Sequence, residues 1–581
     1  MADMVNVKIN GRDVAAPIGS TILEAARIAG IEIPTLCYLK EINAIGACRI
    51  CVVEVKGART LVAACVFPVS EGMEVQTSSP LVLQSRKMTL ELILSTHKRE
   101  CLSCVRSGNC ELQKLCKDFK VDDEDRFDGH NPEYAVDDTS MHMRRNDNKC
   151  ILCRRCVAAC SRWQNVSVIG PNERGFNTHI GCAFDEDLGN VSCVSCGQCI
   201  VVCPTGAIYE KDETDKVWEA LADPKKHVII QTAPSTRVTL GECFGMPVGT
   251  NVEGKMVAAL RRVGFHGVYD TDFAADLTIM EEAHEFVERV KEGGTLPMIT
   301  SCSPGWVKFC EHRYPEFIPN LSTCKSPQQM FGAIAKSWYA QKKGIDVKDL
   351  FVVSAMPCTA KKFEVGRDAE EKFGASDVDV ALTTRELGRL INRAGIMFTE
   401  LPDEAFDAPL DESSGAGVIF GATGGVMEAA LRTAVEELTG EQLGSVDFTE
   451  VRGTQGIKEA TYTVGGLTVN IAVASGLQNA ARLLDSVKSG EKQYHFIEIM
   501  GCPGGCINGG GQPVQPASVR NFVDLKSVRA AALYQADREN PIRKSHESPL
   551  MKKLYAEFLS KPGSPKAHEL LHTHYKKRAR F

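Results

Sequence analysis

Cysteine is the residue type in this sequence that carries the most chemistry. The chain has 24 cysteines in 581 residues, and many of them are separated by two residues. In a small secreted protein such a number would indicate disulfides, but the first residues, MADMVNVKINGRDV, lack the pattern of a signal peptide. Thiols at two-residue spacing in a long chain indicate metal binding instead, and we expect a cytoplasmic protein.

The most specific cysteine pattern occurs twice. CILCRRCVAAC at 150–160 and CVSCGQCIVVCP at 193–204 both have the C-x2-C-x2-C-x3-C spacing of a two-cluster ferredoxin. In that arrangement the fourth cysteine of each run ligates the other cluster. The first predicted 4Fe-4S centre has the ligands Cys150, Cys153, Cys156 and Cys203. The second has the ligands Cys193, Cys196, Cys199 and Cys160.

A looser set of four cysteines precedes these runs, at Cys37, Cys48, Cys51 and Cys65. Gly46 and Ala47 stand directly before Cys48. Small residues favour a loop that wraps closely around an inorganic cluster, so that backbone amides reach its sulfides. The set is interpreted as a 2Fe-2S site with a long first gap, and zinc is the alternative.

A third group, HKRECLSCVRSGNC, supplies His97, Cys101, Cys104 and Cys110. A histidine before a cysteine run is often a surface residue, but a cluster needs four ligands and only three well-spaced thiols are present. Cys116 could be the fourth ligand instead of His97. An imidazole in place of a thiolate would raise the reduction potential of the cluster.

The elements around these residues indicate several domains. VNVKING, STILEAARIAG and VVEVKG predict a small mixed sheet with one helix. From about residue 224 the composition changes, and HVIIQTAPS, LPMITSCS, DLFVVSAMPC, GAGVIFGATGG and HFIEIMGCP are apolar runs of strand length. Helical stretches such as GKMVAALRRVG lie between them. This alternation predicts parallel sheets covered by helices, and overall a multidomain protein of α/β and α+β class.

Three late cysteines, Cys302, Cys358 and Cys502, each follow one of these predicted strands. Because the carboxyl ends of parallel strands meet at one edge, we expect the three residues to converge on one site. No G-x-G-x-x-G or Walker loop is present, which argues against nucleotide binding by this chain. The net charge of -7 gives no case for nucleic acid, and no stretch approaches the length of a membrane span.

Three motifs in this second half resemble the signatures of the di-iron (FeFe) hydrogenases. They are TSCSPGW at 300–306, MPCTAKKFE at 356–364 and EIMGCPGGCINGGGQP at 498–513. The early cysteine sets resemble those that bind the four accessory clusters in the long clostridial form of the family. This resemblance favours His97 over Cys116 as the fourth ligand of the third set. The resemblance implies a 2Fe-2S ferredoxin-like domain at 1–80, a 4Fe-4S domain with one histidine and three cysteine ligands at 81–125, and a two-cluster domain at 126–212. It also implies a catalytic domain at 213–535 and a helical, small-subunit-like tail at 536–581.

The cofactor implied by the resemblance is an H-cluster, a 4Fe-4S cube joined through a cysteine to a di-iron unit with CO, cyanide and a bridging dithiolate amine. Matching positions make Cys358, Cys502 and Cys506 ligands of the cube, with Cys506 as the bridge. Lys361 would hydrogen-bond a cyanide. The remaining pocket residues implied by the resemblance are Pro234, Ser235, Gln328, Met356, Phe420 and Met500. Taken alone, both methionines would be interpreted as core residues.

One position departs from the family pattern. The family usually has two adjacent cysteines, a proton relay followed by the fourth ligand of the cube, whereas this chain has Cys302 and Ser303. Either Ser303 ligates as an alkoxide, the sequence has been altered there, or Cys302 ligates and the relay is shortened. A thiolate suits iron better than a hydroxyl does, so the stability or potential of the cube is affected.

A proton route is predicted on one helix. MEEAHEFVER places Glu282, Glu285 and Arg289 on the same face, where a solvated ion-pair face is the simpler interpretation. The resemblance adds Ser322 and makes the four residues a path that ends at Cys302. Such a path works if burial moves the pKa of each carboxyl toward the working pH.

The sequence therefore predicts an anaerobic enzyme that reversibly oxidises hydrogen and passes electrons through iron-sulfur clusters. The electron partner would be ferredoxin, or flavin- and NAD(P)-binding subunits of an electron-bifurcating complex. The alternatives are a non-catalytic electron-relay subunit, which would not need the three late motifs, and a hydrogen sensor or cluster-assembly relative.

Overall fold

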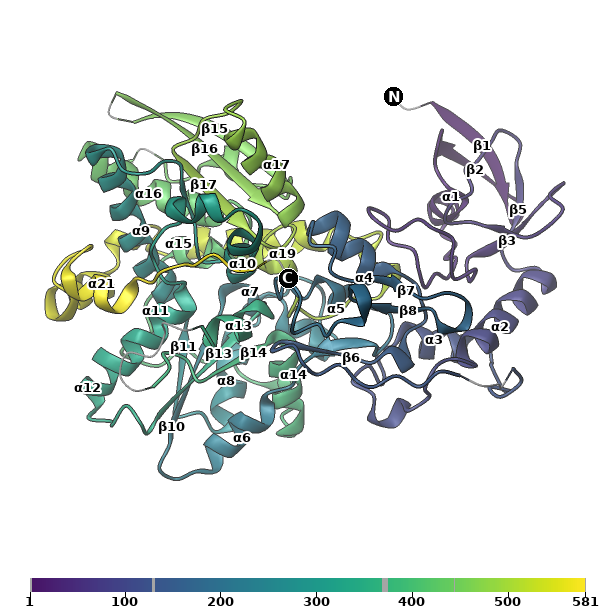
Figure 1. Cartoon of the computed structure of the whole chain (residues 1–581), viewed down its shortest axis with the longest axis horizontal. Coiled ribbons are helices and arrows are strands. Elements are labelled where there is room, and N and C mark those ends of the chain that lie inside the picture. The colour runs from purple at the N-terminus through teal and green to yellow at the C-terminus, as the bar shows by residue number, and fades with distance from the viewer. Residues whose placement is uncertain (1–2, 128–130, 368–374, 444, 465, 580–581) are drawn as a thin grey trace.

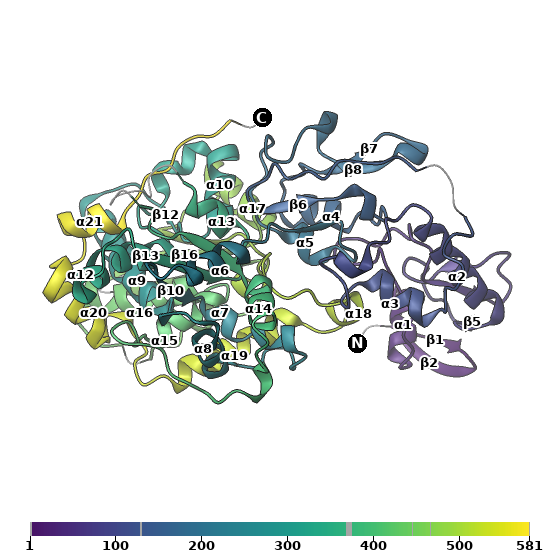
Figure 2. The ribbon, with the colours of Figure 1, turned by 90° about the horizontal axis from the view of Figure 1, so that it is seen from below.

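The computed structural model describes residues 3–127, 131–367, 375–443, 445–464 and 466–579. Figures 1 and 2 show an elongated molecule in which the N-terminal, cysteine-rich part lies at one end and the larger sheet-containing part at the other. The segment from β6 (Met143–Arg145) to β9 (Ile208–Glu210) lies between the two ends. This order in space follows the order of the cysteine sets in the sequence.

The first domain is a five-stranded sheet in the order β2-β1-β5-β3-β4. Its strands are β1 (Met4–Ile9), β2 (Arg12–Pro17), β3 (Val52–Val55), β4 (Val62–Ala63) and β5 (Glu74–Gln76). Helix α1 (Ile22–Ile28) begins with a capping box, because the Thr21 side chain accepts from the Glu24 backbone and Glu24 accepts from Thr21. Its Ile22, Leu23, Ala25 and Ala26 are buried, as the helical pattern in the sequence predicts.

Two short helices follow in the next segment, α2 (Pro80–Leu94) and α3 (Glu111–Asp118). In the two-cluster segment, strands β6 (Met143–Arg145) and β9 (Ile208–Glu210) pair antiparallel. Helices α4 (Arg155–Ala158) and α5 (Gln198–Val202) each begin within one cysteine run. The residues before them, Arg154 and Gly197, have φ of 60° and 68°, a left-handed turn that lets successive cysteines face one centre.

The large domain contains two four-stranded sheets. The first has the order β11-β10-β13-β14 and is parallel throughout, with β10 (His227–Thr232), β11 (Gly267–Asp270), β13 (Leu350–Met356) and β14 (Val380–Thr383). The second has the order β12-β17-β16-β15, with β12 (Met298–Ile299), β15 (Ile457–Val464), β16 (Leu467–Ser475) and β17 (Phe496–Met500). Only the β15–β16 pair in it is antiparallel. The central strands are buried, which explains their continuous apolar sequences.

Helices cover the faces of the first sheet. Helices α8 (Glu253–Val263) and α14 (Thr384–Arg393) pack on one core, while α9 (Asp272–Glu292) and α11 (Pro327–Ile334) pack on the other. One expectation of the sequence analysis is wrong here. GAGVIFGATGG forms α15 (Gly415–Val418) and a 3-10 turn rather than a strand, because Ser414 caps a helix start that is buried among other helices.

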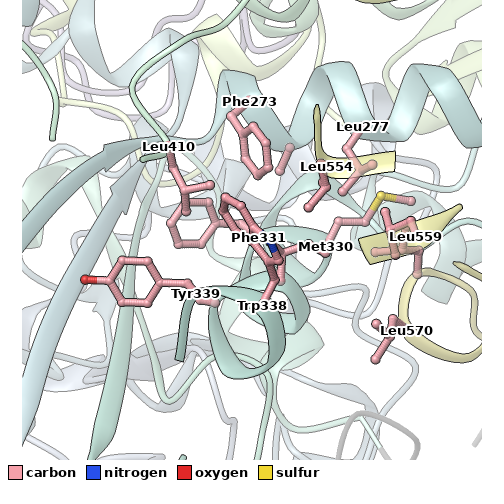
Figure 3. Close-up of a cluster of buried hydrophobic side chains, with 14 of the residues drawn as sticks. Phe273, Leu277, Met330, Phe331, Trp338, Tyr339, Leu410, Leu554, Leu559 and Leu570 are labelled. Atoms are coloured by element: carbon pink, nitrogen blue, oxygen red, sulfur yellow. The ribbon is translucent and has the colours of Figure 1, made fainter. Parts of the chain in front are cut away.

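The C-terminal tail forms α20 (Pro549–Leu554), a π-helical turn at Tyr555–Leu559, and α21 (Pro565–Leu571). Figure 3 shows its Leu554, Leu559 and Leu570 packed with Phe273 and Leu277 of α9. Two helical segments separated by KPGSP were predicted in this region. The tail is thus part of the core of the large domain.

Candidate functional site

The late motifs meet in one cavity. Its walls come from the ends of four strands: Ala233 follows β10, Cys302 and Ser303 follow β12, Met356 ends β13, and Met500 ends β17. Cys358, Cys502 and Cys506 line the same cavity. The predicted convergence of strand ends therefore brings these thiols together, as parallel sheets require.

The three thiols are held in an apolar environment. Burial raises the pKa of Cys506 to about 12, with the charge of Cys358 as the second cause. Burial likewise raises the pKa of Cys358 and of Cys502. A thiolate in such a place needs a cationic partner, so the donor set fits an iron-sulfur cluster. The remaining residues predicted for the pocket, Pro234, Ser235, Gln328, Phe420 and Lys361, also line this cavity.

The glycine-rich stretch at 504–511 lets backbone segments approach one another beside the cavity. Gly505 has φ of 96°, and a Cβ there would lie 2.7 Å from the Thr423 nitrogen. A Cβ at Gly509 would lie 2.2 Å from the Pro357 carbonyl oxygen. A side chain at Gly509 would push apart the loops that carry Cys358 and Cys506, and one at Gly505 would push the Cys506 loop away from the segment 421–423.

Lys361 is oriented by a carboxylate in the cavity wall. Its Nζ donates to the Glu364 Oε2 atom at 2.8 Å and to the Cys302 carbonyl oxygen at 3.2 Å. The same Glu364 oxygen accepts from Ser326 Oγ at 2.9 Å and from Gln328 Nε2 at 3.2 Å. Glu364 was not singled out from the sequence, although it ends the MPCTAKKFE motif and its spacing of three from Lys361 could have indicated the contact.

Glu498 is a second carboxylate that the sequence analysis did not assign. It is fully buried on β17 and accepts from the backbone nitrogens of Gly424 and Met427, both at 2.7 Å. These bonds attach the loop before α16 (Gly425–Thr439) to the strand that leads into Cys502. A charged residue in an apolar strand was the available signal.

Ser303 and Cys302 face different neighbours. The Gly501 backbone nitrogen donates to Ser303 Oγ at 3.1 Å, which places the hydroxyl beside the loop of Cys502. Burial and then the charge of Glu282 raise the pKa of Cys302, so its thiol lies near the predicted proton route. Ser303 thus contacts the loop of Cys502, whereas Cys302 is close to Glu282 and also to Cys506.

Three of the predicted proton residues, Glu282, Glu285 and Arg289, lie on α9, and Ser322 joins them from the segment after Asn320. Ser322 Oγ donates to Glu285 Oε2 at 3.0 Å, and Arg289 Nη2 donates to Glu285 Oε1 at 2.5 Å. Burial first, and then the Glu285 charge, raise the pKa of Glu282 to about 8, while its hydrogen bond with Ser322 opposes the shift. One Glu282 oxygen, Oε2, is buried without a hydrogen-bond partner among the described residues. The structure thus joins Arg289, Glu285 and Ser322 by hydrogen bonds and places the charge of Glu282 close enough to raise the pKa of Cys302.

The 2Fe-2S candidate residues lie together beneath the first sheet. Cys51 Sγ lies 3.4 Å from Cys65 Sγ, and the neighbouring Cys48 thiol lowers the pKa of Cys37. Asn43 Nδ2 donates to the carbonyl oxygens of Cys37, at 2.7 Å, and Cys153, at 3.1 Å. One amide thus joins this site to the next cysteine set.

The two ferredoxin-like runs place their thiols in two groups. Burial, followed by the charges of Cys153 and Cys203, raises the pKa of Cys150. Burial, followed by the charges of Cys193 and Cys160, raises the pKa of Cys199. The neighbours across runs, Cys203 and Cys160, are those that the exchanged-ligand arrangement requires.

His97 has the surroundings of a ligand rather than of a surface residue. Burial lowers the pKa of His97 to about 4, and its Nδ1 atom has no hydrogen-bond partner among the described residues. A half-buried, neutral imidazole whose Nδ1 atom is buried without a partner among the described residues fits metal ligation. Cys101 is exposed while Cys104 and Cys110 are half-buried, and Cys110 Sγ lies 3.7 Å from the Pro204 carbonyl oxygen, next to Cys203. Cys116 is half-buried, and burial raises its pKa to about 12.

The second ferredoxin-like run also touches the cavity loops. Thr359 Oγ1 donates to the Ser195 carbonyl oxygen at 2.7 Å, and Gln198 Nε2 donates to the Asn508 carbonyl oxygen at 2.9 Å. A Cβ on Gly510 would lie 2.1 Å from the Cys196 carbonyl oxygen. The chain of cysteine sets thus ends directly against the loops that hold Cys358 and Cys506.

Comparisons with known proteins agree with this arrangement. The family model described as "Iron only hydrogenase large subunit, C-terminal domain" matches residues 226–510, and "Iron hydrogenase small subunit" matches residues 523–578. The chain is 50% identical to the NADP-reducing hydrogenase subunit HndD of Solidesulfovibrio fructosivorans, with 100% of both chains covered. It belongs to the iron-only (FeFe) hydrogenase family.

Further matches cover the N-terminal part of this hydrogenase. Iron-sulfur family models match residues 2–80 (2Fe-2S cluster binding), 86–125 (the iron-sulfur binding region of NADH-ubiquinone oxidoreductase G) and 149–243 (4Fe-4S dicluster). Iron hydrogenase 1 of Clostridium pasteurianum is 43% identical over 99% of this chain and 100% of that protein. A structure of apo [FeFe]-hydrogenase HydA1 from Chlamydomonas reinhardtii matches with a TM-score of 0.58 and 42% identity, over 64% of this chain and 100% of that one. The hydrogenase thus combines 2Fe-2S and 4Fe-4S domains with an H-cluster domain.

Proposed function

We propose that this hydrogenase is the catalytic, hydrogen-activating chain of its enzyme, and that Cys358, Cys502 and Cys506 hold the cube of the H-cluster. The observation that carries the proposal is the convergence of these three buried thiols with Lys361 in one cavity at the strand ends. When bound there, the cofactor supplies the redox-active iron at which hydrogen is split or formed. The protein supplies the thiolates, the apolar wall and the proton groups.

The position of the fourth cube ligand is assigned to Ser303, and the proton relay to Cys302. Two observations support this assignment. Ser303 Oγ lies beside Gly501, in the loop of Cys502, whereas the charge of Glu282 raises the pKa of the Cys302 thiol. In Ser303→Cys, iron K-edge X-ray absorption of the reconstituted protein is expected to gain an iron-sulfur contribution. Cys302 would instead be the ligand if two results were found. The iron-sulfur contribution would be identical in Ser303→Cys and in the parent, and Cys302→Ala would lose the cube.

Lys361 is assigned to bind an anionic ligand of the cofactor, and Glu364 to position it. The pocket wall contributes Pro234, Ser235, Gln328, Met356, Phe420 and Met500, which exclude water and leave few polar groups. The carboxylate at 2.8 Å fixes the Lys361 ammonium at the cavity surface. A lysine held in this way can donate hydrogen bonds without reorganisation.

Protons are assigned to the route Arg289, Glu285, Ser322, Glu282 and Cys302. Ser322 links the carboxyls by its hydrogen bond to Glu285. Glu282, with its pKa near 8, can hold and release a proton close to neutral pH. The direction of transfer then depends on whether hydrogen is oxidised or formed.

Electrons are assigned to the iron-sulfur sets that end at the cavity. The 2Fe-2S set and the His97 set both adjoin the Cys150, Cys153, Cys156 and Cys203 set, through Asn43 and through Pro204. The Cys193, Cys196, Cys199 and Cys160 set adjoins the cavity loops. The proposed domain limits place these clusters at 1–80, 81–125 and 126–212, the cavity at 213–535, and the helical tail, which has no cluster, at 536–581.

The electron partner is proposed to be a flavin- and NAD(P)-binding subunit, with ferredoxin as a second partner, in the cytoplasm. The support is that the relative HndD is named a subunit of an NADP-reducing hydrogenase, while this chain contains no nucleotide-binding motif. Among the described residues, no helix is long and apolar enough to cross a bilayer. Anaerobic co-purification should recover a flavoprotein partner. A lone monomer that reduces ferredoxin and never recovers a partner would overturn the complex.

Hydrogen uptake by the matured chain with an artificial electron acceptor separates catalysis from the non-catalytic alternatives. We expect turnover that requires the H-cluster and is lost without it. A chain with all clusters loaded that does not turn over hydrogen would be a relay or a sensor.

A further inference from the structure

The C-terminal tail brings a histidine to the proton route. The backbone nitrogen of Thr573 donates to the Thr323 carbonyl oxygen at 2.8 Å, and the Lys325 nitrogen donates to the Leu571 carbonyl oxygen at 2.7 Å. Cys324 and His572 form an antiparallel bridge between these bonds. The leucines of Figure 3 fix the rest of the tail on α9. The position of His572 is therefore set by backbone pairing and core packing.

Three different donor types meet at this point. Ligand atoms of Glu285, Cys324 and His572 all lie within 4.8 Å of one another, and Cys324 Sγ lies 3.8 Å from Glu285 Oε2. Cys324 and His572 are 1% and 8% exposed, and the Glu285 side chain is 14% exposed. The thiol and the imidazole thus form the inner wall, and the carboxylate forms the side nearest to solvent.

The surrounding charge favours a cation. Glu281 Oε2 lies 3.2 Å from His572 Nε2, and the same carboxylate accepts from the Tyr555 hydroxyl and the Gly563 nitrogen. Glu282 and Glu285 lie further along the same helix, and Arg289 pairs with Glu285. The carboxylates of Glu281 and Glu285 therefore face the single guanidinium of Arg289, which leaves room for added positive charge.

We propose that Glu285, Cys324 and His572 form a binding site for a divalent metal ion that accepts sulfur and nitrogen ligands, such as zinc. Zinc takes Cys, His and carboxylate ligands at about 2.0–2.3 Å and accepts a water as a fourth ligand. The donor separations need to contract to about 3.4 Å for a tetrahedron with these bond lengths. The Thr323 hydroxyl, 2.7 Å from His572 Nδ1 and 3.2 Å from Glu285 Oε2, is the group that an ion would displace.

An ion bound here would interrupt proton transfer, and this part of the inference rests on the proposed proton route. Binding replaces the thiol proton of Cys324, which leaves to solvent, and occupies Glu285 as a ligand. Glu285 could then no longer accept from Ser322 and relay to Arg289. Through His572, the tail would thus allow a bound metal ion to stop proton transfer at the outer end of the route.

The test uses matured, tag-free holoenzyme titrated with zinc chloride. Zinc K-edge X-ray absorption should show one sulfur at about 2.3 Å and nitrogen or oxygen ligands at about 2.0 Å. Hydrogen–deuterium exchange between hydrogen gas and D2O should fall as zinc binds and return when EDTA is added. Recovery with EDTA distinguishes a reversible block from damage to the clusters.

Cys324→Ala and His572→Gln should each weaken zinc inhibition at least tenfold, with exchange in the absence of zinc within about twofold of the parent. His546→Gln is the matched control, because it removes a histidine from a second group, Glu436, His546 and Glu547, none of which belongs to the proposed route. Its zinc response should match the parent.

Two results would overturn parts of the inference separately. If zinc in the parent shows no sulfur ligand, or if its affinity is unchanged in both variants, the metal site is wrong. If zinc binds with the expected ligands but exchange is unaffected, the site stands and the assignment of Glu285 to the proton route fails. Catalysis by the holoenzyme without added zinc is measured in the same samples and does not depend on either result.

Discussion

The cysteines of the N-terminal part and those of the catalytic part are brought together in different ways. In the two ferredoxin-like runs, ligands lie within a few residues of one another, and left-handed turns at Arg154 and Gly197 aim them inward. In the cavity, Cys302 and Cys506 are about 200 residues apart and meet because parallel strands end at one edge. Local backbone geometry makes the electron route, whereas sheet topology makes the reaction site, so the two should fail independently.

The largest loss of hydrogen turnover is expected from a substitution of Cys506, the residue predicted to bridge the cube and the di-iron unit. Cys506→Ala should lower hydrogen turnover at least a thousandfold, because a buried ligand is lost while the N-terminal sets are untouched. Activity assays with electron paramagnetic resonance of the accessory clusters check this. Cys310→Ala, which changes a buried thiol elsewhere in the large domain, is the control and should retain turnover. Loss of the accessory signals in Cys506→Ala would break the proposed independence.

The next effect is expected on the proton route. Glu282→Gln should lower turnover by about 100- to 1,000-fold, the usual range for loss of a proton-transfer group. The pKa of Glu282 is raised to about 8 by burial, so the carboxyl is protonated below that pH and loses its proton above it. Hydrogen evolution that depends on this donor should therefore fall as pH rises through about 8, and Glu282→Gln should lack that step. Glu288→Gln, on the exposed face of the same helix, is the control, and an unchanged pH profile in Glu282→Gln would contradict the route.

A smaller effect is expected where the cavity wall positions Lys361. Glu364→Gln should lower turnover about tenfold, because Lys361 and Gln328 lose a charged acceptor but keep an amide oxygen. Infrared bands of the cyanide ligands in the matured enzyme should shift, which a purely structural role would not cause. Unshifted bands with reduced turnover would remove Glu364 from the positioning of Lys361.

The smallest effect is expected at the remote end of the electron route. His97→Cys should keep the cluster and lower its potential, because a thiolate adds negative charge where the imidazole was neutral. Turnover with an artificial acceptor should stay close to that of the parent. Potentiometric titration checks the shift, and an unchanged potential in a cluster that remains loaded would make Cys116 the ligand.

The sequence predicted the ferredoxin-like cluster sites in more detail than it predicted the cavity. The spacing of the runs at 150 and 193 predicts two cluster sites because ligands close in sequence need only a local turn. The cavity could be predicted only as a convergence of Cys302, Cys358 and Cys502, since the pairing of strands decides which loops are neighbours. GAGVIFGATGG was wrongly expected to be a strand, because its apolar content does not distinguish a buried helix from a buried strand.

Residues that act through others were the hardest to predict. Glu364 and Glu498 orient Lys361 and a cavity loop through contacts that depend on the folded chain. His572 reaches Glu285 from 287 positions away because the tail packs on α9. No local pattern in the sequence predicts a contact between residues so far apart in the chain.

Hydrogen–deuterium exchange between hydrogen gas and D2O tests the central claim most directly, since it requires the cavity and the proton route but no electron partner. We predict exchange by the matured full chain, retained in His97→Cys and abolished in Cys506→Ala. Absence of exchange in a chain whose clusters are all loaded, or exchange that persists in Cys506→Ala, would contradict the assignment of the cavity as the reaction site.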